Sequence, residues 1–168
     1  MAASVQIDEQ NGAGAGSPTT NITNSNMGNV DAANLVAATY PVTPGDYTYA
    51  KYQRLQVTNM GGSSAIQNLK VWRTGALGGS ATHLTNAGTT TNYSPLTYVA
   101  PVKIAIANVD NTMPSSVSAT ENLGIGGVLG GAITVAGYSD YLVHQILTDA
   151  GDVAGSTSTM NYQYDEIA

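Results

Sequence analysis

The chain has 168 residues, enough for one domain with a well-buried core and too few for two. Eleven acidic against five basic residues give a formal charge of −6, which argues against a nucleic-acid binder, because phosphate neutralisation needs a surplus of Lys and Arg. Cysteine is absent, which excludes disulfides, thiolate nucleophiles and cysteine-bound metals.

No apolar run approaches membrane-spanning length, and the opening Met-Ala-Ala-Ser-Val-Gln lacks the basic and hydrophobic regions of a signal peptide. We therefore expect that the protein is made in the cytoplasm and that it has no membrane partner. Gly, Ala, Ser, Thr and Asn are abundant, and only 10% of the residues are charged. This composition indicates a turn-rich β protein with a neutral polar surface.

Two elements are predicted near the N-terminus. A short edge strand is expected at residues 4–9, because Val5 and Ile7 alternate with polar residues. A helix of at most two turns is expected at residues 31–38, where alanines favour helix, Asp31 is a suitable cap, and prolines soon follow.

A polar segment separates these two elements. Residues 12–29 begin with alternating Gly and Ala and continue as Thr, Asn, Ser and Gly, with Ile22 and Met27 as the only large apolar residues. Such a segment cannot form a core of its own. We therefore predict that residues 1–30 are an edge strand and an extended polar arm that docks on a neighbouring chain, and that residues 31–168 are a single β domain. A loose N-terminal loop is the alternative.

The clearest strands lie in residues 52–72. Leu55 and Val57 alternate with polar residues, a loop of small residues follows, and Leu69 and Val71 resume the alternation. This pattern predicts strand, loop and strand. Two such strands cannot bury their apolar faces alone, so they require a second sheet.

Further strands are predicted along the rest of the chain, a weak one at residues 81–84 and others at 102–107, 133–135, 141–148 and 160–165. The strand at 141–148 has apolar residues on both faces, which indicates a central position. The loop 149–155 is expected to be a hairpin. The total of seven to nine strands is typical of an antiparallel β-sandwich. The predicted inter-sheet core consists of Leu55, Val57, Leu69, Val71, Ile104, Ile106, Val143 and Leu147.

The stretch from residue 55 to residue 72 also carries a resemblance, in Leu-x-Val-Thr-Asn-x-Gly-Gly-Ser-Ser-x-Ile-x-Asn-Leu-x-Val-Trp. It resembles the paired strands of immunoglobulin-like β-sandwich modules, and it is similar to small virion structural proteins of tailed bacteriophages. Residues 139–143 and 161–166 extend the likeness. The resemblance implies an immunoglobulin-like fold with Trp72 in the core. It also implies a virion structural protein.

Few residues are suited to catalysis. The chain has two histidines and no Gly-x-Ser-x-Gly. His83 lies in a threonine-rich stretch and is expected at the surface, whereas His144, between apolar neighbours, is expected to be half-buried and satisfied. Asp149 and Asp152 are expected to accept local backbone hydrogen bonds in preference to a calcium ion. The glycine-rich stretch 124–131 lacks the spacing of a phosphate-binding loop. We expect no catalytic residue, cofactor or metal.

All five basic residues lie between positions 51 and 103, with no acidic residue among them. Their grouping suggests a mildly basic face suited to lattice contacts, with chance as the alternative. The predicted contact patch consists of Lys51, Arg54, Lys70, Arg73 and Lys103, together with Ile22 and Met27 from the arm.

The favoured hypothesis is a non-enzymatic virion structural protein, most simply a decoration (cement) subunit on the outer capsid lattice. Its expected partners are a capsid or other virion protein and further copies of itself. A tail or neck position is a variant of this hypothesis. The alternative is a carbohydrate-binding or adhesin-type module, in which exposed Tyr and Trp would stack on sugar rings.

Overall fold

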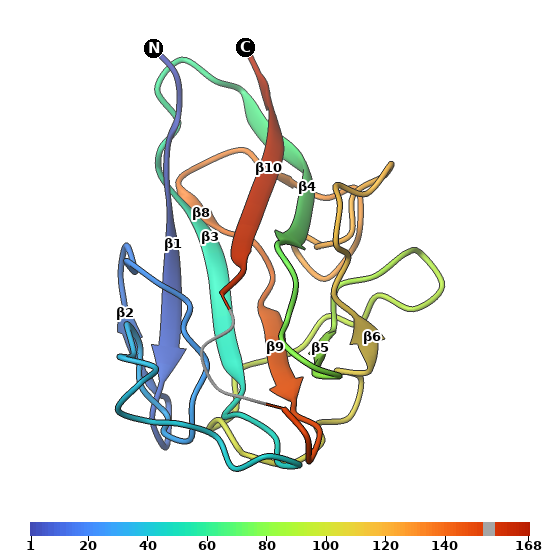
Figure 1. Ribbon diagram of the computed structural model, residues 1–168. Helices are drawn as coiled ribbons and strands as arrows, with labels where there is room; N and C mark the ends of the chain where they lie inside the picture. Colours follow the sequence, from blue (N-terminus) through green and yellow to red (C-terminus); the bar gives the residue numbers. More distant parts are fainter. Residues whose placement is uncertain (153–156) are drawn as a thin grey trace.

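The computed structural model describes residues 1–152 and 157–168, which form ten strands and no helix (Figure 1). The strands are β1 (Ser4–Asn11), β2 (Ser17–Thr19), β3 (Lys51–Asn59), β4 (Ala65–Thr74), β5 (Thr82–Thr85), β6 (Asn111–Thr112), β7 (Ala132–Ile133), β8 (Gly137–Tyr138), β9 (Leu142–Leu147) and β10 (Thr159–Ile167).

These strands make two antiparallel sheets. The large sheet has seven strands in the order β2-β1-β3-β9-β5-β6, with β8 also paired to β3. The small sheet has three strands in the order β10-β4-β7 and lies over part of the large one (Figure 1). The predicted all-β class and antiparallel pairing are confirmed. The predicted central position of residues 141–148 is also confirmed, because β9 lies between β3 and β5.

The prediction for the two clearest strands was correct for the strands themselves and wrong for their pairing. β3 belongs to the large sheet and β4 to the small one, so the loop of small residues crosses between sheets. Neighbouring strands come from distant parts of the chain, as in the pair Thr159–Thr74 of β10 and β4. The loop between β9 and β10 likewise joins different sheets and is no hairpin. Its residues 153–156 lie outside the described residues.

The main core fills the space between the sheets. It contains four predicted core residues of β3 and β4, and its buried members are Leu55, Val57, Ile66, Leu69, Val71, Ala87, Met113, Leu123, Ile125, Ile133 and Leu142. A second cluster lies on the opposite face of the large sheet, where Tyr52 and Val143 pack beneath the segment 94–109. The predicted core residue Val143 therefore belongs to this second cluster.

The predicted strand at residues 102–107 is wrong. The segment forms turns, and Ile104 is 65% exposed. The chain turns through Asn108, whose φ is 63°, and Val109 N–H donates to Ile106 O. Ile106 is half-buried against the second cluster. The alternating residues 102–107 therefore belong to a loop that packs on the large sheet and pairs with no strand.

Three other predictions are corrected. Residues 31–38 are not helical, because Asn34 has a φ of 53°, which no α-helix accommodates. Trp72 is half-buried outside the core, because Val71 on the same strand faces inward and its neighbours face outward. Leu147 is only half-buried at the end of β9.

The polar segment 12–29 folds back on its own sheet in place of the expected extended arm. β2 pairs with the end of β1, and Ile22 N–H donates to Ile7 O at 2.9 Å. The turn between β1 and β2 ends at Gly16, which has a φ of 69° and lies against the Tyr98 ring, so no side chain fits there.

Candidate functional site

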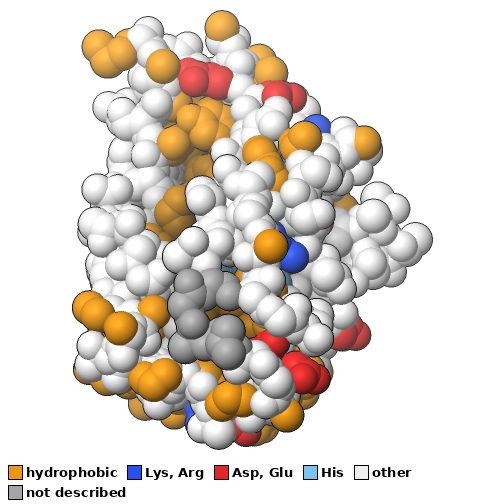
Figure 2. All heavy atoms as spheres, viewed as in Figure 1, with side chains coloured by type: hydrophobic (Ala, Val, Ile, Leu, Met, Phe, Trp, Pro, Cys, Tyr) orange, Lys and Arg blue, Asp and Glu red, His pale blue; other side chains and the backbone are white. Residues whose placement is uncertain are grey.

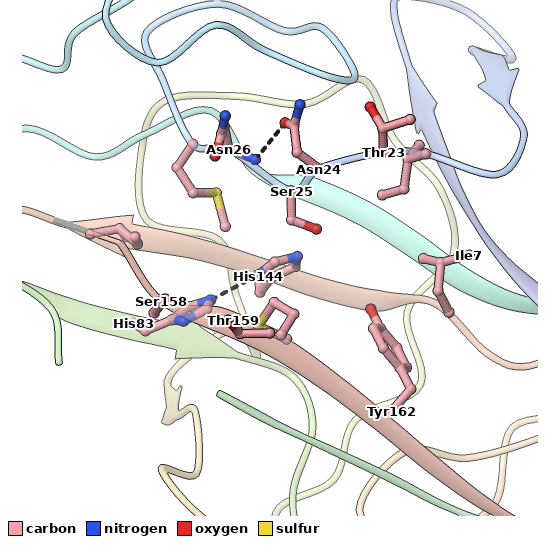
Figure 3. A pocket seen from close by; sticks show the side chains of 14 residues that line it. Ile7, Thr23, Asn24, Ser25, Asn26, His83, His144, Ser158, Thr159 and Tyr162 are labelled. Atoms are coloured by element: carbon pink, nitrogen blue, oxygen red, sulfur yellow. Dashed lines mark hydrogen bonds between the residues drawn. The ribbon is translucent and has the colours of Figure 1, made fainter. Parts of the chain in front are cut away.

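A cavity of about 370 Å³ lies on the inner face of the large sheet, beside the small sheet (Figure 3). Ile7 of β1, His83 of β5 and His144 of β9 line it from the large sheet, and Met160 and Tyr162 line it from β10. The remaining lining residues are Ile22, Thr23, Asn24, Ser25, Asn26, Met27, Ile146, Ser158 and Thr159.

Two buried histidines form the floor of this cavity. His83 and His144 are 3% and 0% exposed, and His83 Nε2 lies 2.8 Å from His144 Nδ1 in a hydrogen bond (Figure 3). The outer nitrogens, His83 Nδ1 and His144 Nε2, have no hydrogen-bond partner among the described residues. The prediction of a surface-exposed His83 is therefore wrong, and His144 is fully buried and only partly satisfied.

Both imidazoles are neutral at neutral pH. Burial, followed by the nearby Arg73 guanidinium, lowers the pKa of His83 to about 4. Burial also lowers the pKa of His144 well below its usual range, and His83 and Lys51 lower it further. A neutral imidazole has one N–H and one lone pair, so the pair presents one donor and one acceptor at its two outer nitrogens.

A buried polar cluster lies beside the histidines. Lys51 Nζ and Glu9 Oε1 form an ion pair at 2.8 Å, with side chains 1% and 0% exposed. Lys51 also donates to Ala32 O at 2.7 Å. Gln53 Nε2 donates to Glu9 Oε2 at 2.9 Å, and Tyr162 donates to Gln53 Oε1 at 2.9 Å. The two buried charges therefore compensate each other.

The segment Ile22–Met27, which we call the cover, lines one side of the cavity (Figure 3). Its Ser25 Oγ accepts from Gln53 Nε2 at 2.7 Å, and its Asn26 Nδ2 donates to Leu35 O at 2.8 Å. Met27 Sδ accepts a long hydrogen bond from Thr48 Oγ1 at 3.8 Å. The cover is thus held mainly by polar contacts.

The structure does not bring the predicted contact patch together. Ile22 and Met27 do lie near each other, at the cavity. Lys51 is removed from the surface by its buried ion pair, and this part of the prediction is wrong. Arg54 faces the other side of β3, where its Cζ lies 3.9 Å from the centre of the Tyr138 ring.

The other three basic residues have local partners. Lys70 on β4 donates to Ala119 O at 3.0 Å, and Arg73 on the same strand donates to a neighbouring backbone carbonyl. Lys103 lies 3.7 Å from Asp46. The expected acceptor role of Asp152 is confirmed, since its carboxylate accepts from the N–H groups of Ser80 and Asp149.

The buried polar cluster was missed, although the sequence contains a signal for it. Lys51 and Gln53 share the alternation of Leu55 and Val57, and Glu9 shares that of Ile7. Polar residues at inward positions of a strand must find partners, because an unpaired polar group loses its hydration on burial. An inward position of this kind is therefore a signal, within the sequence itself, of a buried polar network.

A second feature, which we call the loop end, lies opposite the two chain ends (Figure 1). The turn that contains Asp46 meets the segment that contains Lys103 there, and Ala50 N–H donates to Val102 O at 3.2 Å. Large apolar side chains are exposed on the segment that contains Lys103, namely Val99, Val102 and Ile104.

Within residues 1–152 and 157–168, no three His, Asp or Glu side chains gather as a metal-binding group. No helix in these ranges has the length and apolarity to cross a bilayer. Comparison of the chain with protein-family models, with curated proteins and with solved structures finds no match. The functional argument therefore depends on the chain's own geometry.

Proposed function

We propose that this protein is a non-enzymatic structural component of a virion, most simply a decoration subunit on the outer capsid lattice. The observation that carries the proposal is the loop end. Val99, Val102 and Ile104 are 53%, 38% and 65% exposed there, on one short segment. Closely spaced exposed apolar side chains of this kind mark protein-interaction surfaces in soluble proteins.

The rest of the surface supports this proposal. Only 10% of the residues are charged, so partner contacts rely on shape and apolar burial more than on ion pairs. The two-sheet architecture fits the immunoglobulin-like sandwich that the resemblance implies, and we include that fold in the proposal. The same kind of contact surface suits a position in the head, tail or neck of the virion.

The proposal predicts that the loop end binds the particle. Particles are purified on a density gradient from lysates of cells that carry this gene, and the recombinant protein is added and sedimented with them. The double substitution Val99→Asp and Ile104→Asp should weaken binding at least about tenfold, because it places charges in an apolar contact. The matched control, Val117→Asp and Val128→Asp, alters valines of similar exposure on other loops and should leave binding unchanged.

Failure of the wild-type protein to bind particles would contradict the proposal.

The second candidate function, an adhesin-type module, is favoured by the outer face of β3. Arg54 stacks there on Tyr138 and Tyr141, and Gln56 donates to the Tyr138 hydroxyl at 2.9 Å. Aromatic and amide side chains on one face of a sheet suit sugar rings. Retention of the protein on a glycan array, lost in Tyr138→Ala, would favour that second function.

A further inference from the structure

The small sheet leaves part of the large sheet uncovered along β10. β1 lies beyond β10 on that side, and hydrophobic side chains line a hollow between the two strands (Figures 1 and 2). Val5 and Ile7 of β1 and Tyr164 of β10 are among the half-buried residues at this margin of the core. The cavity floored by the histidines continues this hollow.

The hydrogen bonds of β4 reveal which groups of β10 are free. Val71 N–H donates to Asn122 Oδ1 and Val71 O accepts from Asn122 Nδ2, both at 2.8 Å. Arg73 N–H donates to Pro114 O at 2.9 Å. The main-chain groups of Val71 and Arg73 therefore point away from β10.

In antiparallel pairing, hydrogen-bonded and non-hydrogen-bonded pairs alternate along the strands. Val71 pairs with Tyr162 and Arg73 with Met160, so both are non-hydrogen-bonded pairs. The N–H and C=O groups of Met160 and Tyr162 consequently point to the open edge of β10. Neither residue has a main-chain partner there in the described part of the chain.

This open edge has the features of a strand-binding site. An added strand would lie about 4.8 Å from β10 and cover β1 at the usual spacing between packed sheets. β1 of the large sheet flanks this edge (Figure 1), so the space beside β10 is a hollow between two strands. The hollow therefore suits a single extended segment.

The walls also define the chemistry of that segment. The described lining residues include no Asp, Glu, Lys or Arg, and His83 and His144 are uncharged, so a charged side chain entering the cavity would lose its hydration without a counter-ion. His144 Nε2 is buried at the floor and has no hydrogen-bond partner among the described residues. Alternating apolar and small polar side chains match these walls.

We propose that the open edge of β10 binds one extended, uncharged segment of a neighbouring chain in the particle, which adds a fourth strand to the small sheet and places a side chain in the cavity beside His144. This inference depends on the proposed virion function and names the second contact of the same protein. The bound segment makes its main-chain hydrogen bonds to Met160 and Tyr162.

Hydrogen–deuterium exchange tests this contact, measured with residue resolution by mass spectrometry on the free protein and on protein bound to the purified particles. The amides of Met160 and Tyr162 should exchange at least about tenfold more slowly on the particle. The amide of Asn161, which faces β4, serves as the control and should be protected in both states.

A substitution tests the same hydrogen bonds. Met160→Pro removes the free donor without removing a β4 bond and should weaken particle binding at least about tenfold, whereas Met160→Leu should bind normally. If Met160→Pro fails to fold by circular dichroism, the wild-type exchange data decide. Particle binding with unchanged exchange at Met160 and Tyr162 would overturn this inference and leave the proposed function standing. Absence of any particle binding would overturn both.

Discussion

At the scale of single residues, the shared proton of the histidine pair is the most consequential detail. If His144 Nδ1 donates to His83 Nε2, His144 Nε2 is left as an acceptor, and the reverse bond makes it a donor. The pair therefore adapts to either kind of partner without a change in net charge. The role of His144 Nε2, as donor or acceptor, fixes the opposite role for His83 Nδ1.

The pair predicts acid sensitivity. A histidine in the unfolded chain titrates near about pH 6.5, whereas burial lowers the pKa of His83 to about 4 in the fold. The unfolded state therefore binds the proton first as pH falls. The free energy of unfolding is therefore highest, as far as His83 is concerned, above about pH 6.5. It falls by about 3 kcal/mol as pH drops toward about 4.

Urea unfolding at steps between pH 7 and pH 4 measures this loss. The double substitution His83→Gln and His144→Gln should flatten the curve over that range, because glutamine does not titrate. An equally steep curve in the variant would show that carboxylates account for the whole effect.

At the scale of elements, the contrast between β4 and the segment 102–107 tests the core. Leu69 is 1% exposed between the sheets, whereas Ile104 is largely exposed at the loop end. Leu69→Ala should lower the free energy of unfolding by about 2–5 kcal/mol, and Ile104→Ala by less than about 0.5 kcal/mol. Urea denaturation gives both values, and similar losses in the two variants would refute the assignment.

Alternation predicted most of the long strands and could not predict their partners. β3 and β4 have clear patterns, but nothing in a period of two says which sheet a strand joins. The same limit explains the error at residues 102–107, where the alternating residues cover the outer face of the large sheet as a loop. The local sequence pattern indicates which face of a strand is apolar. The choice of the neighbouring strand depends on contacts with residues that are distant in the sequence.

The candidate site was harder to predict for the same reason. His83 and His144 meet only because β5 pairs with β9 in one register. Their surroundings in the sequence differ, one rich in threonine and one apolar, so neither stretch indicates the other. The cover was recognised as polar and unable to form its own core, but its docking place on β1 and Gln53 depends on the assembled sheet.

At the scale of the whole molecule, the polar segment 12–29 is the point on which sequence and structure differ most. The sequence suggested that a neighbouring chain orders it, whereas the structure holds it by bonds within one chain. We therefore predict that the Ile22 amide is protected from hydrogen exchange in the isolated monomer, because it is bonded to Ile7 O.

Nuclear magnetic resonance of the monomer at low concentration measures this protection directly. The control is Asn21, whose amide is bonded to the Asp8 carboxylate and should also be protected. Exchange at the random-coil rate for both amides would restore the interpretation that a neighbour orders the segment.

The crossing of the chain between sheets after β3 also governs how this protein folds. No hairpin unites β3 with β4, and the small sheet is incomplete until β10 has been synthesised to pair with β4. Before that moment, β4 pairs among the described strands only with the two residues of β7, and its other edge is unpaired. Contacts so distant in sequence make folding slow and leave the nascent chain prone to aggregation. The edge of β4 is therefore open to pairing with other chains until β10 completes the small sheet.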